Sequence, residues 1–186
     1  MNFLVRAAVA CAFALALSGC IDSAKPILSD SQSVFGEHLR FQAYGMRKGV
    51  ANGGEIAAFK WNGTLYTHSR GGFKDTRAFS VHPFENGDFI IQSLPAGRAG
   101  IIEYAVMHKI IDGVYQVIAI DEADADEPTR SANCSKGEKG DRACRIETRD
   151  QLFAFARATA ARRKDDGGLA IRLSADEPKR PDKRRR

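Results

Sequence analysis

Four histidines are the residues of this chain with the widest chemical range. They are His38, His68, His82 and His108, and each lies in or beside a segment whose pattern predicts a β-strand. Near neutral pH a histidine can serve as a general base or bind a metal ion. No pair has the spacing of a known ligand motif, and no acidic partner recurs beside them. We therefore expect partly exposed or hydrogen-bonded sheet residues, with a functional histidine cluster as the alternative.

The acidic run 121–127 is the second group with a chemical possibility. It places Asp124 and Asp126 at alternate positions, as calcium-binding loops do. An EF-hand needs a glycine for its sharp turn and a bidentate glutamate further on, yet Pro128 follows the run and the glutamate is missing at the required distance. The prediction is a solvated acidic loop beside the basic residues of 136–142, with no bound metal.

Serine chemistry and phosphate binding have weaker signals. Ser69 and Ser80 have histidines nearby in the sequence, but neither stands in a nucleophile-elbow motif. The glycine-containing segment 95–100 includes Arg98 but leads into a predicted strand, whereas a phosphate cradle needs a helix N-terminus after its glycines. The sequence therefore predicts no catalytic constellation and no cofactor site, and it favours a protein that is not an enzyme.

The N-terminus has the pattern of an export signal. One basic residue, Arg6, precedes an apolar run of about eleven residues from Ala7 to Leu17. That run is too short for a membrane-spanning helix, which needs roughly 20 apolar residues. We expect a signal peptide over 1–19 that is removed from the mature chain.

The end of this run resembles a known processing motif. Leu17-Ser18-Gly19-Cys20 is similar to the lipobox of bacterial lipoproteins, in which a branched apolar residue and two small residues precede the acylated cysteine. The resemblance implies cleavage before Cys20 and lipid on its thiol, with palmitate among the acyl chains. The alternative is a secreted protein cleaved after Ala14-Leu15-Ala16, whose small-x-small pattern also suits a signal peptidase.

The residues after Cys20 bear on the membrane to which the lipid would attach. In proteobacterial lipoproteins an aspartate directly after the cysteine favours the inner membrane. Here Ile21 holds that place, and Asp22 comes one residue later. The resemblance therefore favours a lipid anchor in the cell envelope, at the outer membrane and facing the periplasm, over the inner membrane.

Cysteine usage fits an exported protein. Of four cysteines, Cys11 leaves with the signal peptide and Cys20 takes the lipid, so Cys134 and Cys144 remain. An oxidising compartment favours a disulfide between them, which would stabilise the fold by about 2 to 3 kcal/mol. Two free thiols are the alternative. A zinc site is disfavoured, because two cysteines without a nearby histidine do not supply four ligands.

Composition divides the mature chain into a lipid-anchored tether over 20–37, a single globular domain over 38–175 and a disordered basic tail over 176–186. The whole chain has a net charge of +5, and the tail alone holds six basic and three acidic residues. The domain is therefore close to neutral, which argues against nucleic acid as a partner. Docking of Lys179–Arg186 on anionic lipid head groups is the alternative for the tail.

Three dipeptides that favour two-residue turns predict three hairpins. The hairpins are expected at Asn62-Gly63 between 56–61 and 64–68, at Asn86-Gly87 between 77–85 and 88–94, and at Asp112-Gly113 between 101–111 and 114–120. A two-residue turn in the first hairpin would set Phe59 opposite Tyr66. It would also set Trp61 opposite Thr64, so that one face of this hairpin is aromatic.

One helix and two further strands complete the prediction. Thr148 with Gln151 resembles a capping box. Apolar residues recur at helical spacing after it, at Leu152, Phe155, Ala156 and Ala160. Alternation predicts a first strand over 39–46 and a last, half-buried strand after Gly167-Gly168. In the last strand the apolar face is expected to be Leu169, Ile171 and Leu173. The expected fold class is α+β, an antiparallel β-sheet of about seven or eight strands built from hairpins, with one C-terminal helix packed on it.

The expected function is that of a non-catalytic binding or accessory module tethered to a membrane, whose partner is another envelope protein or a cell-wall polymer. The absence of a chemical constellation motivates this expectation. The alternative is a small-ligand-binding protein or an enzyme that uses the aromatic face around Phe59, Trp61 and Tyr66 with a histidine as acid or base. That alternative predicts a concave surface lined by these rings, and burial of the rings under the helix would count against it.

Overall fold

A computed structural model of the protein describes residues 21–23, 25–47, 50–68, 78–94, 102–136, 142–162 and 167–173. The predicted signal peptide, Cys20 and the basic tail 176–186 lie outside the described residues. The described strands are β1 (Ile21–Ser23), β2 (His38–Arg47), β3 (Val50–Trp61), β4 (Tyr66–His68), β5 (Ala78–Pro83), β6 (Phe89–Leu94), β7 (Ile102–Ile111), β8 (Val114–Ala119), β9 (Cys134–Lys136), β10 (Arg142–Arg145) and β11 (Gly167–Arg172). The helical elements are the 3₁₀ turns η1 (Glu85–Gly87) and η2 (Glu122–Asp124) and the α-helices α2 (Glu127–Asn133) and α3 (Arg149–Arg162).

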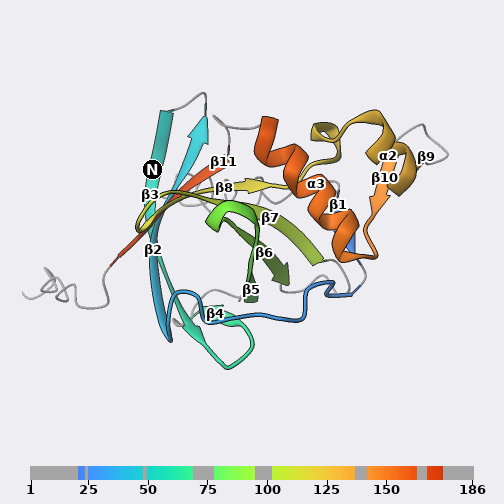
Figure 1. The fold of residues 1–186 in the computed structure, drawn as a ribbon. Helices are drawn as coiled ribbons and strands as arrows, with labels where there is room; N and C mark the ends of the chain where they lie inside the picture. Colours follow the sequence, from blue (N-terminus) through green and yellow to red (C-terminus); the bar gives the residue numbers. More distant parts are fainter. Residues whose placement is uncertain are drawn as a thin grey trace, which may run out of the picture.

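Eight of the strands form a closed antiparallel barrel (Figure 1). Strands β2 to β8 follow one another around it in chain order, and β11 closes it by pairing with β8 on one side and β2 on the other. β1 pairs with β7, and β10 and β9 extend the sheet from β1. The structure thus has the antiparallel hairpins that the sequence predicts, and the sheet is closed on itself rather than open.

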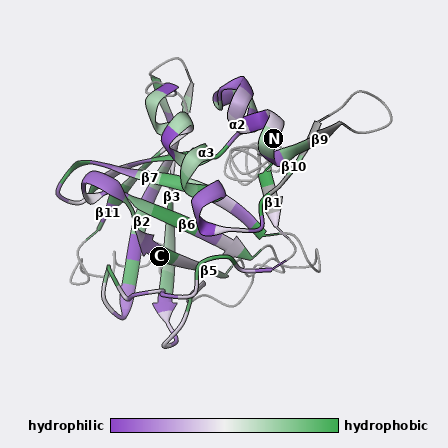
Figure 2. Ribbon diagram, turned by 45° about the vertical axis from the view of Figure 1, so that its right-hand side comes forward, coloured by the Kyte–Doolittle hydropathy of each residue, from purple (hydrophilic) through white to green (hydrophobic). Residues whose placement is uncertain are grey.

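Two hydrophobic cores lie on the two faces of the barrel wall. The buried residues of the inner core are Phe35, Leu39, Phe41, Tyr66, Val81, Ala105, Met107, Tyr115, Val117 and Ala170. The outer core lies where apolar residues of β6 and β7 meet α3. Figure 2 shows the hydrophobic colour of these two strands beside the helix. Because successive strand residues point to opposite faces, β6 and β7 contribute to both cores.

Phe35, from the segment before β2, fills part of the barrel interior and is 2% exposed. Its ring lies 5.5 to 6.3 Å, between centroids, from those of Phe41, Tyr66, Phe89 and Tyr115. The Phe35 N–H donates to the Tyr66 hydroxyl at 3.0 Å, and the Phe35 carbonyl accepts from Arg172 Nη2 at 3.0 Å. Both backbone groups of this buried residue are therefore satisfied, which burial requires.

The segment predicted as a tether over 20–37 packs on the barrel in its described part. Ile21 and Leu28 belong to the outer core and Phe35 to the inner one. A segment that sends single side chains into two separate cores has no hydrophobic period, so the pattern that identifies strands and helices does not detect it.

Strand β11 fits between β2 and β8 because two of its residues, Gly167 and Ala170, have little or no side chain. Ala170 points into the barrel, and a Cβ at Gly167 would collide with the Val117 carbonyl oxygen. Alternation predicts Leu169 and Ile171 as the buried face, and this prediction is wrong, because both are half-buried on the outer wall. Aromatic rings already occupy the interior beside Ala170, so a small side chain fits there.

The predicted turn length is correct in the last of the three hairpins and wrong in the first. The two-residue turn at Asp112-Gly113 is confirmed, since Ile111 pairs with Val114. At Asn62-Gly63 the predicted register is wrong, because Trp61 pairs with Tyr66 across a four-residue loop. The Asn62 side chain accepts hydrogen bonds there from the N–H groups of residues 64 and 65, at 3.0 and 2.8 Å. That side-chain turn replaces the tight backbone turn.

The second hairpin also has a longer connection than predicted. Pro83 pairs with Phe89, and the loop between them contains η1. Within η1, Asn86 and Gly87 have positive φ values of 56° and 82°. The Asn-Gly signal therefore marks the turn correctly, although it does not fix its length.

Helix α3 begins with the predicted capping box. The Gln151 N–H donates to Thr148 Oγ1 at 3.3 Å, and the Thr148 N–H donates to Gln151 Oε1 at 3.0 Å. Leu152, Phe155 and Ala156 are buried against the barrel wall. Within the described ranges, no helix is long and apolar enough to cross a membrane.

Replacing Phe35 with alanine tests the role of its ring. Phe35→Ala removes a fully buried ring and leaves a cavity between four others, so we expect the free energy of unfolding to fall by about 3 to 5 kcal/mol. Urea denaturation followed by circular dichroism measures this. Phe153→Ala is the control, because that ring is only half-buried beside Phe84. Equal losses in the two variants would contradict the central role of Phe35.

Candidate functional site

The four histidines lie in four separate environments. His38 is exposed, and His108 is exposed with its Nδ1 2.9 Å from Asp88 Oδ2. His82 is buried on the outer side of the barrel wall, and His68 points into the barrel. In the part of the chain that the structure describes, no group able to share a metal ion contains a histidine.

His82 belongs to a buried polar network that holds the N-terminal segment to the barrel. Its Nε2 lies 2.8 Å from Ser80 Oγ, which also accepts a hydrogen bond from Gln92 Nε2 at 3.2 Å. The Gln92 side-chain oxygen accepts from the N–H groups of Ile27 and Leu28, at 3.0 and 3.1 Å. Gln92 Nε2 also donates to the Leu28 carbonyl at 3.1 Å. The geometry gives His82 a structural role.

Burial lowers the pKa of His82, because an apolar environment disfavours the charged imidazolium. Asp30 opposes this shift through a hydrogen bond and its charge, and the charge of Arg149 adds to it. The neutral imidazole is therefore the form that the folded protein prefers.

The acidic run 121–127 caps two helical turns instead of forming an open loop. Asp121 accepts a hydrogen bond from the Ala123 N–H at 2.9 Å at the start of η2. Asp126 accepts one from the Thr129 N–H at 2.9 Å at the start of α2. Hydrogen bonds from Thr129 lower the pKa of Asp126. These caps explain the run. Asp126 followed by Pro128 in the first turn is a local signal for the start of α2, and the sequence-based prediction did not include this helix.

The side chains that line the barrel interior become smaller or more polar beyond Phe35. On β2, β4, β6 and β8 the inward positions that follow the four rings around Phe35 are Ala43, His68, Ile91 and Val117. We call the end toward which these four strands run the far end. Aromatic residues surround Phe35 itself, whereas smaller or polar side chains occupy the next positions.

Several inward side chains at the far end keep part of their exposure to solvent. Cross-strand partners point to the same face of a sheet. Ala57 therefore faces inward as the partner of Phe41, Phe79 as the partner of Tyr66 and Ile91 as the partner of Val81. We call Ala57, His68, Phe79 and Ile91 the far-end lining, and all four are half-buried. Solvent thus reaches inward positions both beside the rings around Phe35 (Ala57 and Phe79) and beyond them (His68 and Ile91).

The far-end lining combines apolar surface with one imidazole. The Phe59 ring contacts both His68 and Phe79, with ring centroids 5.3 and 4.9 Å apart. Of the three rings that the sequence places on one hairpin face, Tyr66 is fully buried in the barrel. Phe59 and Trp61 are half-buried against the same inner core, and not under the helix. The far-end lining is therefore mainly apolar, with one imidazole among its members.

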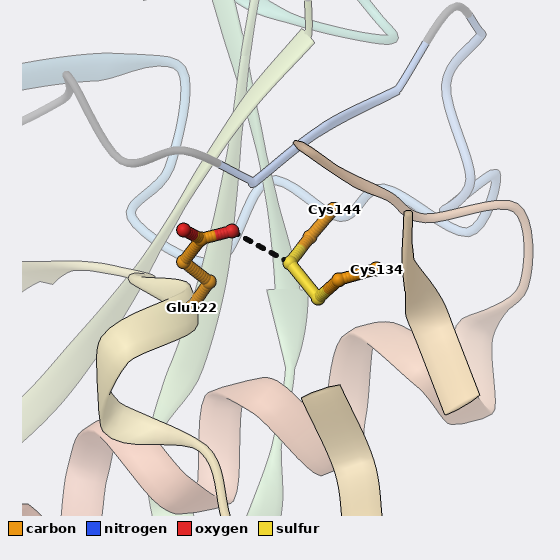
Figure 3. A group of neighbouring side chains, drawn as sticks. All are labelled: Glu122, Cys134 and Cys144. Carbon is orange, nitrogen blue, oxygen red and sulfur yellow. Dashed lines mark hydrogen bonds between the residues drawn. A yellow bond between two sulfur atoms is a disulfide. The ribbon is translucent and has the colours of Figure 1, made fainter. Parts of the chain in front are cut away.

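A second cluster lies outside the barrel, where η2 brings Glu122 to the two cysteines (Figure 3). Cys134 and Cys144 are direct cross-strand partners on β9 and β10, and their sulfur atoms lie at bonding distance. Glu122 Oε2 lies 2.7 Å from Cys144 Sγ. Cys144 is 1% exposed, and the other two residues are half-buried.

These three residues are the one group among the described residues whose ligand atoms lie close enough to hold a metal ion, all within 4.8 Å. The thiolate is the form of cysteine that binds metals, and a bonded sulfur is not a thiolate. In the disulfide form the group is therefore not a metal site. Glu122 stands 22 residues before Cys144, and no sequence motif joins the two residues.

The lowered pKa of His82 predicts a pH dependence of stability. The unfolded chain takes up this proton near pH 6.5 and the folded chain only at lower pH, so acidification favours unfolding. The contribution is fully present above the unfolded pKa and is lost as the pH falls through the folded pKa. We expect a smaller drop in the urea midpoint between about pH 7.5 and about pH 5.5 for His82→Gln than for the native protein. An identical drop would contradict this role.

Comparison with protein-family models, with curated proteins and with solved structures finds no significant match to this chain. What the protein binds therefore has to be inferred from its own side chains.

Proposed function

We propose that the domain is a non-catalytic binding module that takes a small, mainly apolar molecule at the far end of its barrel. The observation that carries this proposal is the partial exposure of the far-end lining. Its members point into a closed barrel yet remain half-buried, while Phe35 and Tyr66 beside them are buried.

The size of the barrel supports the proposal. An eight-stranded barrel has an interior just wide enough for its own side chains or for one small ligand. Here Phe35 and the rings around it fill one part. Beside and beyond them the inward positions include Ala57 and Ala119, both half-buried, which leave more room than large side chains would.

The lining also indicates the chemistry of the ligand. Phe79 and Ile91 offer apolar surface, and each Å² of apolar surface removed from water contributes roughly 25 cal/mol. His68 offers one hydrogen-bonding group. A matching ligand has an apolar body and a single polar or acidic group.

The location of the module is a further part of the proposal. The lipobox resemblance at Cys20 supports a lipid anchor in the cell envelope, with the outer membrane favoured. An anchored barrel would bind its ligand close to a membrane, where apolar molecules concentrate.

A matched pair of substitutions on β3 tests ligand binding. Ala57→Trp places an indole among the far-end lining, whereas Ala58→Trp places it on the outer wall, where residue 58 pairs with Arg40. The probe is anilinonaphthalene sulfonate, which has an apolar body and one acidic group. Fluorescence titration should show saturable binding to the native protein and to Ala58→Trp, and at least about tenfold weaker binding to Ala57→Trp, a loss of about 1.4 kcal/mol.

Stability measurements control for damage to the fold. Overpacking costs typically about 1 to 3 kcal/mol, so urea denaturation of both variants is measured first. The proposal fails if Ala57→Trp folds and binds the probe as tightly as Ala58→Trp does.

A specific observation favours a second candidate, the binding of another envelope component, either a protein or a cell-wall polymer. Four apolar residues share one row across the outer wall of the barrel, Ile56, Ile171, Val114 and Ile111, with Gln42 between the first two. Ile56 and Ile111 are 49% and 63% exposed. Exposed apolar rows of this kind occur at protein interaction sites.

Crosslinking in intact cells, followed by mass spectrometry, tests this second candidate. The comparison is between the native chain and Cys20→Ser, which cannot take the lipid. Capture of one envelope partner by the native chain, with at least about tenfold less by Cys20→Ser, is expected if the anchor presents the outer wall to that partner. Equal capture by both forms would remove the role of the anchor, and no specific capture by either would leave the ligand-binding barrel as the only proposal.

A further inference from the structure

The contact between Glu122 and Cys144 is not explained by a disulfide alone. Oε2 and Sγ lie 2.7 Å apart, which is a hydrogen-bond distance. A bonded sulfur carries no hydrogen, so in the disulfide form a hydrogen bond between these atoms requires Glu122 in its protonated carboxyl form. In the reduced protein the Cys144 thiol has a hydrogen of its own, and the Glu122 carboxylate can accept it. One proton therefore fits between the two atoms in both redox states.

The two sulfur atoms differ in their access to solvent. Cys134 is half-buried, whereas Cys144 is 1% exposed in the outer core beside apolar residues such as Ile21 and Ile146. An incoming thiolate attacks the sulfur that it can reach, and the other sulfur leaves with the electron pair. An apolar environment disfavours a thiolate, so the departing Cys144 sulfur needs a proton.

We propose that Cys134–Cys144 is a redox-active disulfide in which an external thiolate attacks Cys134 and Glu122 protonates the departing Cys144 sulfur. This site lies outside the barrel, so it is independent of the proposed ligand binding.

The exchange balances with a thiol as the reductant. In the first step a thiolate forms a bond to Cys134 Sγ, the Cys134–Cys144 bond breaks, and the Cys144 sulfur takes the Glu122 proton. A second thiolate then attacks the outer sulfur of the mixed disulfide and releases the Cys134 thiolate, which takes a proton from water. In sum, two thiols are oxidised to one disulfide while the protein disulfide is reduced to two thiols.

The kinetics of reduction test the proposal. The whole chain carries Cys11→Ser and Cys20→Ser so that no other thiol takes part, and 2-mercaptoethanol is the reductant. Free thiols are counted by alkylation and intact-mass measurement at successive times. Glu122→Gln should slow reduction at least about tenfold, since general acid catalysis contributes about that much or more. The rate per thiolate should fall with rising pH in the native chain and be independent of pH in the variant.

Glu127→Gln is the matched control. It makes the same Glu→Gln substitution at the start of α2, the helix that ends just before Cys134, where the Glu127 carboxylate accepts hydrogen bonds from Arg130 and Ser131. We expect its reduction rate to stay within about twofold of the native value, the size of a surface charge effect. Circular dichroism of the oxidised forms verifies that each variant is folded.

The direction of the effect distinguishes a proton donor from a negative charge. A carboxylate that only repels the incoming thiolate would, once removed, make reduction faster. A faster or unchanged rate for Glu122→Gln overturns the proposal, and so does an equal slowing by Glu127→Gln.

Single-cysteine variants test the site of attack without changing Glu122. Cys144→Ser retains the accessible sulfur and should form a mixed disulfide with glutathione disulfide at least about tenfold faster than Cys134→Ser, since exchange depends on access. The reverse order would overturn the assignment of Cys134 as the attacked sulfur.

Discussion

The limited interior of an eight-stranded barrel is the constraint on which this structure depends. Phe35 enters that space from outside the sheet and occupies one part of it among four aromatic rings. The segment that delivers it must therefore pass along the barrel wall, where Gln92 binds its backbone. The strand that closes the barrel has little volume left on its inner side at Ala170, and at Gly167 the backbone of β8 leaves no room for a Cβ.

The outer core depends on a different set of contacts. Helix α3 covers part of the wall, and β1 and β10 lie beside it through residues such as Ile21 and Cys144, which are cross-strand partners. The disulfide joins β10 to β9, and η2 directs Glu122 toward it. The two proposed sites thus belong to two cores. The proposed ligand site lies beside the inner core, inside the barrel. The proposed redox site lies in the outer core, at the disulfide.

Local signals predicted much of the secondary structure. The Asp112-Gly113 turn and the Thr148–Gln151 capping box each depend on residues close in sequence, and both are present. The closure of the sheet depends on β11 meeting β2, and no local pattern encodes such a pairing. For the same reason the inward face of β11 was predicted incorrectly, since volume inside the barrel, and not hydrophobicity, selects Ala170 over Leu169.

The candidate sites also differ in whether they depend on local sequence or on the tertiary fold. The cysteine pair could be identified because the chain has only four cysteines, of which the sequence assigns one to a predicted signal peptide and one to a predicted lipobox. Glu122 and the far-end lining could not, because their members come together only through the tertiary fold. The sequence did not distinguish His68 from the other three histidines as a functional candidate. Only the register of β4 places it inside the barrel.

The position of β11 also affects how the chain folds. Strands β2 and β8 are its two neighbours, and both precede it, β2 by more than a hundred residues. During synthesis or export in chain order, these strands emerge with unpaired edges and stay so until residues 167–172 arrive. Contacts between distant parts of a chain form slowly, and unpaired edges are prone to aggregate. The barrel therefore places its greatest folding risk in the interval before its last strand, which is when a chaperone that covers strand edges would have most effect.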